Sequence, residues 1–175
     1  MNWINRYIDH PLLDGAAASL RKWHAYTGLR PAGLEPAWNI LVLFFVLVMS
    51  GRFLQGYALI LSVAAIIMLA LPSAARLVSE LWGDGKTYGA REYKALRARA
   101  LSNRETQWTL RLMVLIAAAC LPFFAHITDP TGAAFMLGAS LWFVLTVPFK
   151  VYLDAAEPPT PGSGDRAFRG QIQFG

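Results

Sequence analysis

The fold is decided by residues 36–75, PAWNILVLFFVLVMSGRFLQGYALILSVAAIIMLALPSAA, in which Arg52 is the only charged side chain. A second apolar stretch covers residues 112–149, where Asp129 is the only charged residue. An α-helix rises about 1.5 Å per residue and needs about 20 apolar residues to cross a bilayer core, so each stretch is about twice that length. Turn residues such as Gly51 and Asp129 stand near the middle of each stretch. The pattern predicts an all-α membrane protein with four transmembrane helices arranged as two hairpins.

Composition agrees with this class, and charge predicts the orientation. The 175 residues are 55% hydrophobic, with a mean hydropathy of +0.39 and a formal net charge of +5. Of 16 Lys and Arg residues, four precede Pro36, eight lie in residues 76–111 and three follow Phe149. This is the positive-inside pattern of a multi-pass inner-membrane protein, so we expect both termini and the central loop in the cytoplasm. The expected partner of the basic residues is an anionic leaflet, not nucleic acid.

The chain divides into five predicted segments. They are a cytoplasmic amphipathic N-terminal segment (1–33), a first transmembrane hairpin (34–72), a basic cytoplasmic loop with an amphipathic helix (73–107), a second hairpin (108–153) and a flexible cytoplasmic tail (154–175).

The N-terminal segment has the pattern of helices that lie on a membrane surface. Trp3, Ile4 and Tyr7 stand at helical spacing, and Pro11 and Gly15 predict a break between two short interfacial helices. The apolar side chains of such helices enter the headgroup boundary. The alternative is that the same face packs against the protein's own cytoplasmic loop.

The central loop contains a basic amphipathic helix at residues 90–107. Tyr93, Leu96 and Ala100 recur at spacings of three to four, and basic residues fill much of the remainder. We expect these cations, and those that border the apolar stretches, to contact lipid headgroups or a partner, with Arg111 reaching toward the headgroups from its helix end. The predicted contact residues are Arg76, Arg91, Lys94, Arg97, Arg99, Arg104 and Arg111.

The sequence contains no convincing catalytic or metal motif. Residues 83–87, GDGKT, end like a phosphate-binding loop, but Glu80 stands where that motif has its first glycine, so we expect a turn. Cys120 is the only cysteine and lies in an apolar stretch. His126, at the predicted membrane rim, is a candidate axial ligand for haem or a chlorophyll-type pigment; the alternative is an ordinary turn residue.

Two further features indicate association. Ala134 and Gly138 stand four residues apart, a spacing of small residues that lets helices pack closely, either within the bundle or between chains. The Pro- and Gly-rich tail carries Phe168 and Phe174, which are candidate anchors for a partner if the tail does not remain disordered.

These features predict a non-catalytic accessory or assembly subunit of a larger inner-membrane complex. The predicted spans hold no carboxylate at mid-depth, so a proton- or sodium-coupled carrier is disfavoured. The alternative is a small permease or lipid-active membrane enzyme, with Arg76, Arg91, Arg104 and Arg111 facing phosphate headgroups. A third reading is a pigment- or haem-binding subunit that uses His126.

Overall fold

The computed structural model describes residues 2–82, 88–124 and 129–161, and every secondary-structure element in these ranges is a helix. After the single turn α1 (Asn2–Ile4), a π-helix (Asn5–Asp9) leads into α2 (His10–Thr27), and a 3₁₀ turn (Pro31–Gly33) leads into α3 (Leu34–Phe53). The remaining helices are α4 (Gly56–Trp82), α5 (Ala90–Thr106), α6 (Trp108–Phe124) and α7 (Pro130–Ala155). The predicted all-helical class is confirmed for the described residues.

Three helical segments are long and apolar enough to cross a membrane: Pro31–Phe53, Gly56–Trp82 and Pro130–Ala155. Helix α6 is also apolar, but its 17 residues are at the lower end of what a crossing needs. The long helices expose many large apolar side chains, such as Phe44 on α3 and Met68 on α4. A soluble protein would bury such a surface, so the structure indicates a multi-pass membrane protein.

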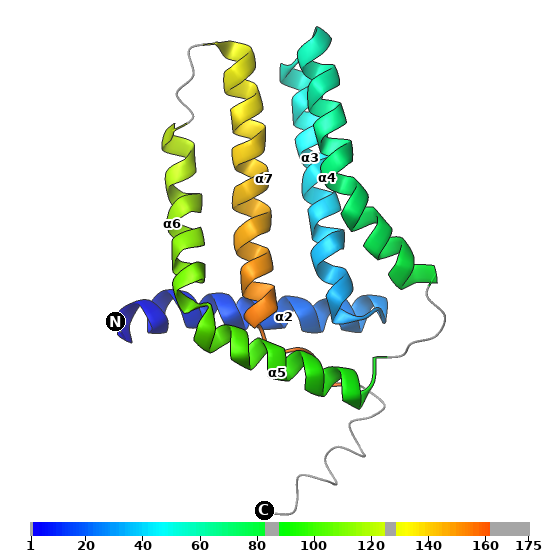
Figure 1. The fold of residues 1–175 in the computed structure, drawn as a ribbon, viewed down its shortest axis with the longest axis vertical. Helices are drawn as coiled ribbons and strands as arrows, with labels where there is room; N and C mark the ends of the chain where they lie inside the picture. The colour runs from blue at the N-terminus through cyan, green and yellow to red at the C-terminus, as the bar shows by residue number, and fades with distance from the viewer. Residues whose placement is uncertain (1, 83–87, 125–128, 162–175) are drawn as a thin grey trace, which may run out of the picture.

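The apolar helices stand beside one another, and two further helices lie across one end of them. Figure 1 shows α3, α4, α6 and α7 upright, with α2 and α5 beneath them. We call α2 and α5 the platform. Helix α3 packs on α4 and α7, and α7 also packs on α6. The first residues of α3 and α6 and the last residues of α4 and α7 all lie at the platform end.

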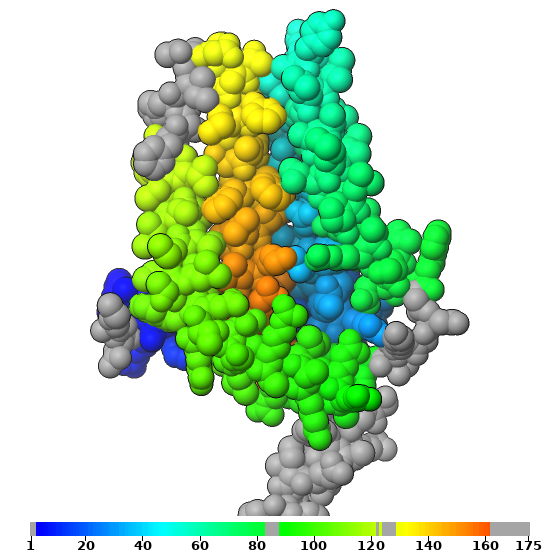
Figure 2. Space-filling view, viewed as in Figure 1, coloured from blue at the N-terminus to red at the C-terminus, as the bar shows by residue number. Residues whose placement is uncertain are grey.

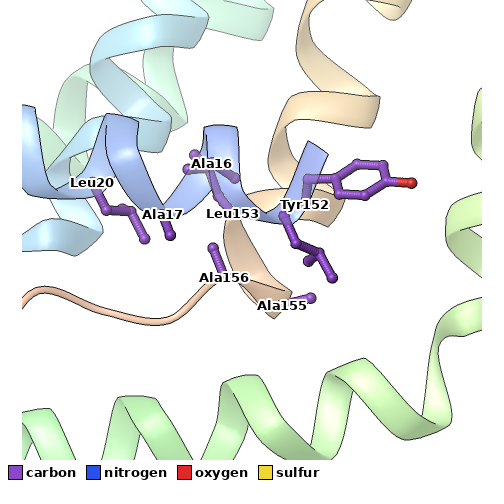
Figure 3. Close-up of a cluster of buried hydrophobic side chains, with 8 residues drawn as sticks. Ala16, Ala17, Leu20, Tyr152, Leu153, Ala155 and Ala156 are labelled. Atoms are coloured by element: carbon purple, nitrogen blue, oxygen red, sulfur yellow. The ribbon is translucent and has the colours of Figure 1, made fainter. Parts of the chain in front are cut away.

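A buried apolar cluster joins the platform to the bundle. Leu13, Ala16, Ala17 and Leu20 of α2 pack against Tyr152, Leu153, Ala155 and Ala156 at the end of α7 (Figure 3). Trp3 and Tyr7, in contrast, are exposed, each by more than three-fifths. The amphipathic N-terminal segment therefore divides its apolar residues between the protein's own α7 and the outer surface.

The N-terminal helices differ from the prediction in one respect. Pro11 and Gly15 do not break the helix, because Pro11 falls in the first turn of α2 and Gly15 lies within it. The π-helix ends at Asp9, two residues before Pro11. In a regular α-helix the Pro11 ring would meet the carbonyl of Tyr7, four residues earlier. The π-helix therefore lets the chain remain helical through the proline.

Two of the later helices contain an internal proline. Helix α4 continues ten residues beyond Pro72, and α7 continues through Pro148 to Ala155. Membrane helices tolerate proline because neighbouring helices and polar side chains compensate for the lost hydrogen bond. The last part of α4 leans away from the other upright helices in Figure 1, and Pro72 within this helix is a known cause of such bends.

The start of α7 is set by Asp129 and Pro130. The Asp129 Oδ2 accepts a hydrogen bond of 2.7 Å from the Gly132 amide, and Pro130 occupies the first helical position. Both are the preferred residues at these positions. Asp129, predicted as a turn residue, is therefore the N-cap of α7.

Candidate functional site

Charged residues that border the two apolar stretches meet at the platform end of the bundle. Glu35 directly precedes residues 36–75, Arg76 follows them, and Lys150 follows residues 112–149. The Lys150 Nζ donates to Glu35 Oε1 at 2.6 Å, and the Arg76 Nη1 lies 3.9 Å from the same oxygen. Helices α3, α4 and α7 thus each bring their boundary charge to one place.

These three residues line a cavity of about 380 Å³ above α5. Arg99 from α5 and Asp154 from α7 also line this cavity. Its volume lies within the range of small-molecule pockets. The cavity therefore combines three cationic and two carboxylate side chains at the edge of the apolar region.

A groove leads from this cavity along the bundle. A second hollow of about 300 Å³ shares Glu35, Arg76 and Lys150 with the cavity, and a third of about 160 Å³ shares Leu69 and Trp142 with the second. We call these two hollows the groove. Figure 2 shows α3, in blue, at the bottom of the space between α7 and the lower part of α4. The groove becomes more apolar with distance from the platform, where residues such as Ile66 and Phe135 line it.

Polar side chains bind the three walls of the groove together. The Trp142 Nε1 of α7 donates to Asn39 Oδ1 of α3 at 2.9 Å, and Asn39 Nδ2 donates to Ser73 Oγ of α4 at 2.8 Å. Trp38 adds a hydrogen bond of 2.8 Å to the Leu145 carbonyl. Because these donors find acceptors on other helices, they specify how α3, α4 and α7 pack.

A second charged cluster holds the N-terminal segment against α6 and α7. The Arg111 side chain, which is 2% exposed, donates from Nε to Asp9 Oδ1 and from Nη2 to Asp9 Oδ2, both at 3.0 Å. The Tyr152 hydroxyl donates to Asp9 Oδ1 at 3.1 Å. Arg111 also donates to the carbonyls of Asn103 and Arg104, at 3.1 and 3.2 Å. This fully engaged cluster ties together the π-helix, α5, α6 and α7.

Helix α5 caps the carboxyl end of α7. Asn103 Nδ2 donates to the Asp154 carbonyl and Arg104 Nε to the Ala155 carbonyl, both at 3.0 Å. The last carbonyls of a helix lack partners within it and carry partial negative charge, so a guanidinium stabilises them. Arg104 therefore acts here as part of the platform's attachment to the bundle.

The structure separates the seven cations predicted to contact lipid or a partner. Arg111 does not reach toward the headgroups as predicted, because its guanidinium is buried against Asp9. Arg76 and Arg99 line the cavity, and Arg104 caps α7. Arg97 approaches Glu157 at 3.3 Å, and the exposed side chains of Arg91 and Lys94 lie on α5.

The predicted grouping of Arg76, Arg91, Arg104 and Arg111 in one site is not formed. Arg104 caps α7 and Arg111 is buried against Asp9.

The small residues of α7 face its neighbour within the same chain. A Cβ built on Gly138 would lie 3.4 Å from Val46 Cγ1 of α3, and Ala134 lines a hollow with Val46 and Met49. The sequence left open whether these small residues pack within the bundle or between chains. The contact with Val46 is packing within the bundle. The other association candidates, Phe168 and Phe174, lie outside the described residues.

Histidines do not form a metal site in the described part of the chain. No group of three or more His, Cys, Asp or Glu residues there could hold a metal ion. His10 is exposed, and the His24 Nδ1 is 2.8 Å from the Leu29 carbonyl oxygen. His126, the candidate haem or pigment ligand, lies outside the described residues.

Tyr88 joins the start of the platform helix α5 to the segment after α7. Its hydroxyl donates to the Pro159 carbonyl at 2.7 Å, and its ring meets the His24 ring edge-on. Burial raises the pKa of the Tyr88 phenol, with smaller contributions from Tyr93 and Glu92. The hydroxyl therefore remains a protonated donor at neutral pH.

Sequence reasoning missed Asp9 and Lys150 as parts of these clusters. Asp9 was visible only as an acidic residue of an amphipathic segment, yet it stands on the same helical face as Leu13, Ala16 and Leu20. A carboxylate on the apolar face of a helix needs a buried cationic partner. That signal could have indicated Asp9, although not that its partner is Arg111.

Comparison with known proteins gives no match to a family model, to a curated protein or to a solved structure. Function is therefore inferred from the chain's own geometry.

Proposed function

We propose that this chain crosses a bacterial-type inner membrane four times, as two hairpins with the platform in the cytoplasm. We further propose that it is a non-catalytic accessory or assembly subunit of a larger membrane complex.

The position of α7 supports four crossings. Helix α4 ends at the platform, and α7 also ends there, because its last turns pack on α2. The chain must therefore return to the far end before α7 begins, and α6 makes that passage. At about 1.5 Å per residue α6 is about 25 Å long, and local thinning of the bilayer or flanking residues can make up the difference.

The distribution of charge supports a cytoplasmic platform. Helices α2 and α5 contain Arg21, Lys22 and five basic residues of α5, whereas Arg52 is the basic residue nearest the described far end. Positive residues of short loops remain on the cytoplasmic side during insertion.

The observation that carries the subunit role is the use of charged residues to hold helices together. Asp9 and Arg111 bind each other, Arg104 caps α7, and Lys150 binds Glu35. Each of these contacts joins residues of different helices, so the charged groups hold the helices in place. This structural use of charge supports the subunit role.

Helix α4 offers the surface on which a partner would pack. It packs mainly on α3, and its outward side chains, among them Leu61 and Met68, are more than three-fifths exposed. In a complex this face contacts another subunit's helix; in a lone protein it contacts lipid alone.

Purification of the tagged chain in mild detergent, at its native expression level, tests the proposal. We expect a complex of defined stoichiometry well above the 19.3 kDa of the chain. The variant Leu61→Ala/Met68→Ala should reduce the yield of partners while leaving the amount of this chain unchanged. A matched control is Met113→Ala/Ile116→Ala, which changes two exposed apolar residues of α6.

Two outcomes would contradict the proposal. A monomer or homodimer without partners excludes a stable subunit role and favours the permease or lipid-enzyme alternative. Equal loss of partners in both variants excludes α4 as the contact surface. The absorption spectrum of the same sample tests the third reading, since haem or pigment bound through His126 would give visible bands.

A further inference from the structure

The cavity and the two hollows of the groove adjoin one another, and together they are amphipathic. Arg76, Lys150 and Glu35 line both the cavity and the lower groove, and Leu69 and Trp142 line both parts of the groove. Residues of α5 line the polar end, and residues of α3, α4 and α7 line the apolar end. A ligand that fits this space has a charged head and a hydrocarbon body.

The charges at the polar end favour an anion. Glu35 is occupied by Lys150 at 2.6 Å, whereas Arg76 lies 3.9 Å from it and is 64% exposed. Arg99 forms no ion pair within 4 Å among the described residues, although it interacts electrostatically with Asp154 at longer range. With Asp154 included, three cationic and two carboxylate side chains line the cavity. A phosphate bound beside Arg76 and Arg99 would neutralise the remaining positive charge.

The apolar end suits an acyl chain. Leu43, Ile66 and Leu69 line it with Trp142, and Ala139 leaves room on the α7 side. The groove is open beside α4, where bilayer lipid lies if the upright helices cross a membrane (Figure 2). A lipid therefore reaches the groove from the side.

We propose that this space binds one anionic phospholipid, with its phosphate between Arg76 and Arg99 and an acyl chain along α3, α4 and α7. The bound lipid fills the gap left where the lower part of α4 leans away, and its phosphate links α4 to the platform. The inference does not depend on the subunit role, because it concerns the chain's own lipid.

Native mass spectrometry of the full chain in detergent tests this site. Phosphatidylglycerol and phosphatidylcholine with identical acyl chains are titrated separately. The first lipid molecule should bind about tenfold more tightly when it is phosphatidylglycerol, because both lipids carry the phosphate but the quaternary ammonium of phosphatidylcholine is repelled by the excess positive charge at the polar end. Equal affinity for the two lipids would overturn the proposal.

Two charge-matched variants locate the phosphate. Arg76→Gln/Arg99→Gln should lower the affinity for phosphatidylglycerol about tenfold, to the level of phosphatidylcholine. Arg52→Gln/Arg91→Gln removes the same charge from exposed residues that do not line the space, and should change affinity less than about twofold. Equal weakening by both variants would mean a general attraction of lipid to basic protein and would overturn the site.

A second pair of variants tests the acyl chain. Ala139→Phe fills the groove and should weaken phosphatidylglycerol binding, whereas Ala117→Phe adds the same bulk to an exposed position on α6 and should not. This comparison decides the proposal if the arginine variant fails to fold. Displacement of the lipid by excess inorganic phosphate or glycerol phosphate would show a free-anion site instead, and would also overturn it.

Discussion

The Arg111 guanidinium and the Asp9 carboxylate form two parallel hydrogen bonds of 3.0 Å across 102 positions of sequence. Both side chains are buried, and the Tyr152 hydroxyl completes the carboxylate's contacts. The pair joins the N-terminal π-helix to the start of α6, so it fixes the platform relative to the upright helices. A buried ion pair is costly to break, because removal of one partner leaves the other charge without compensation.

We therefore expect Asp9→Ala to lower the free energy of unfolding by about 3–5 kcal/mol. Chemical unfolding of the purified protein in detergent micelles measures the change. Asp14→Ala, at an exposed position of α2, is the control and should shift stability by less than about 0.5 kcal/mol. The double variant Asp9→Leu/Arg111→Met should recover most of the loss, since no buried charge remains. Asp9→Leu and Arg111→Met are also measured singly; if the double variant is as unstable as the sum of these two changes, the pair is not coupled as described.

The bridge from Trp142 through Asn39 to Ser73 gives a second prediction. Asn39→Leu removes both hydrogen bonds of this bridge, and each such bond in a membrane bundle contributes about 0.6–1.7 kcal/mol. We expect a total loss of about 1–3 kcal/mol in unfolding free energy. Ser73→Ala removes only the bond to α4 and should cost about half as much. Equal costs for the two variants would show that the Trp142 bond contributes nothing.

The apolar stretches predicted the apolar helices well, three of which are long enough to cross a membrane, because hydropathy depends on local sequence. The helix predicted at residues 90–107 is α5, Ala90–Thr106, and the one predicted from Trp108 is α6. Proline positions were less informative for helix ends, because Pro11 and Pro72 each lie in a helix that continues. Whether a proline ends a membrane helix depends on neighbours that satisfy the backbone, and these are tertiary contacts.

The sequence predicted where charged residues would gather, but not which of them would pair. Charges were expected at the ends of the apolar stretches, and Glu35, Arg76 and Lys150 are found there. Which cation meets which carboxylate depends on the packing of α2, α3 and α7, which are distant in sequence. For this reason Arg111 appeared as a headgroup contact, whereas its partner is Asp9.

Close packing of α7 on α3 at Gly138 gives a third prediction. A Cβ here would be in ordinary contact with Val46 Cγ1 at 3.4 Å, so Gly138→Ala should change stability by less than about 1 kcal/mol. Gly138→Leu overfills the interface and should cost about 1–3 kcal/mol. Gly51→Leu is the matched control, since no atom lies within 4 Å of a Cβ at Gly51. Rescue of Gly138→Leu by Val46→Ala would confirm the contact; loss of stability in the Gly51 control alone would contradict it.

The fourth prediction distinguishes four membrane crossings from three. In a Cys120→Ser background, single cysteines are placed at Gln55 between α3 and α4, at Thr131 in the first turn of α7, and at Ser102 on α5; all three positions are exposed. Spheroplasts are treated with a membrane-impermeant maleimide before and after permeabilisation. With four crossings, Gln55→Cys and Thr131→Cys react in intact spheroplasts, and Ser102→Cys reacts only after permeabilisation.

Thr131→Cys is the decisive position because α6 alone determines its side. If α6 does not cross, residue 131 stays with the platform and reacts only after permeabilisation, while Gln55→Cys still reacts from outside. Helix α7 would then end on the side opposite the platform, which is incompatible with the packing of Leu153 and Ala156 on α2. Labelling of Ser102→Cys in intact spheroplasts would reverse the orientation and contradict the cytoplasmic platform. The three cysteines thus test the number of crossings and their direction separately.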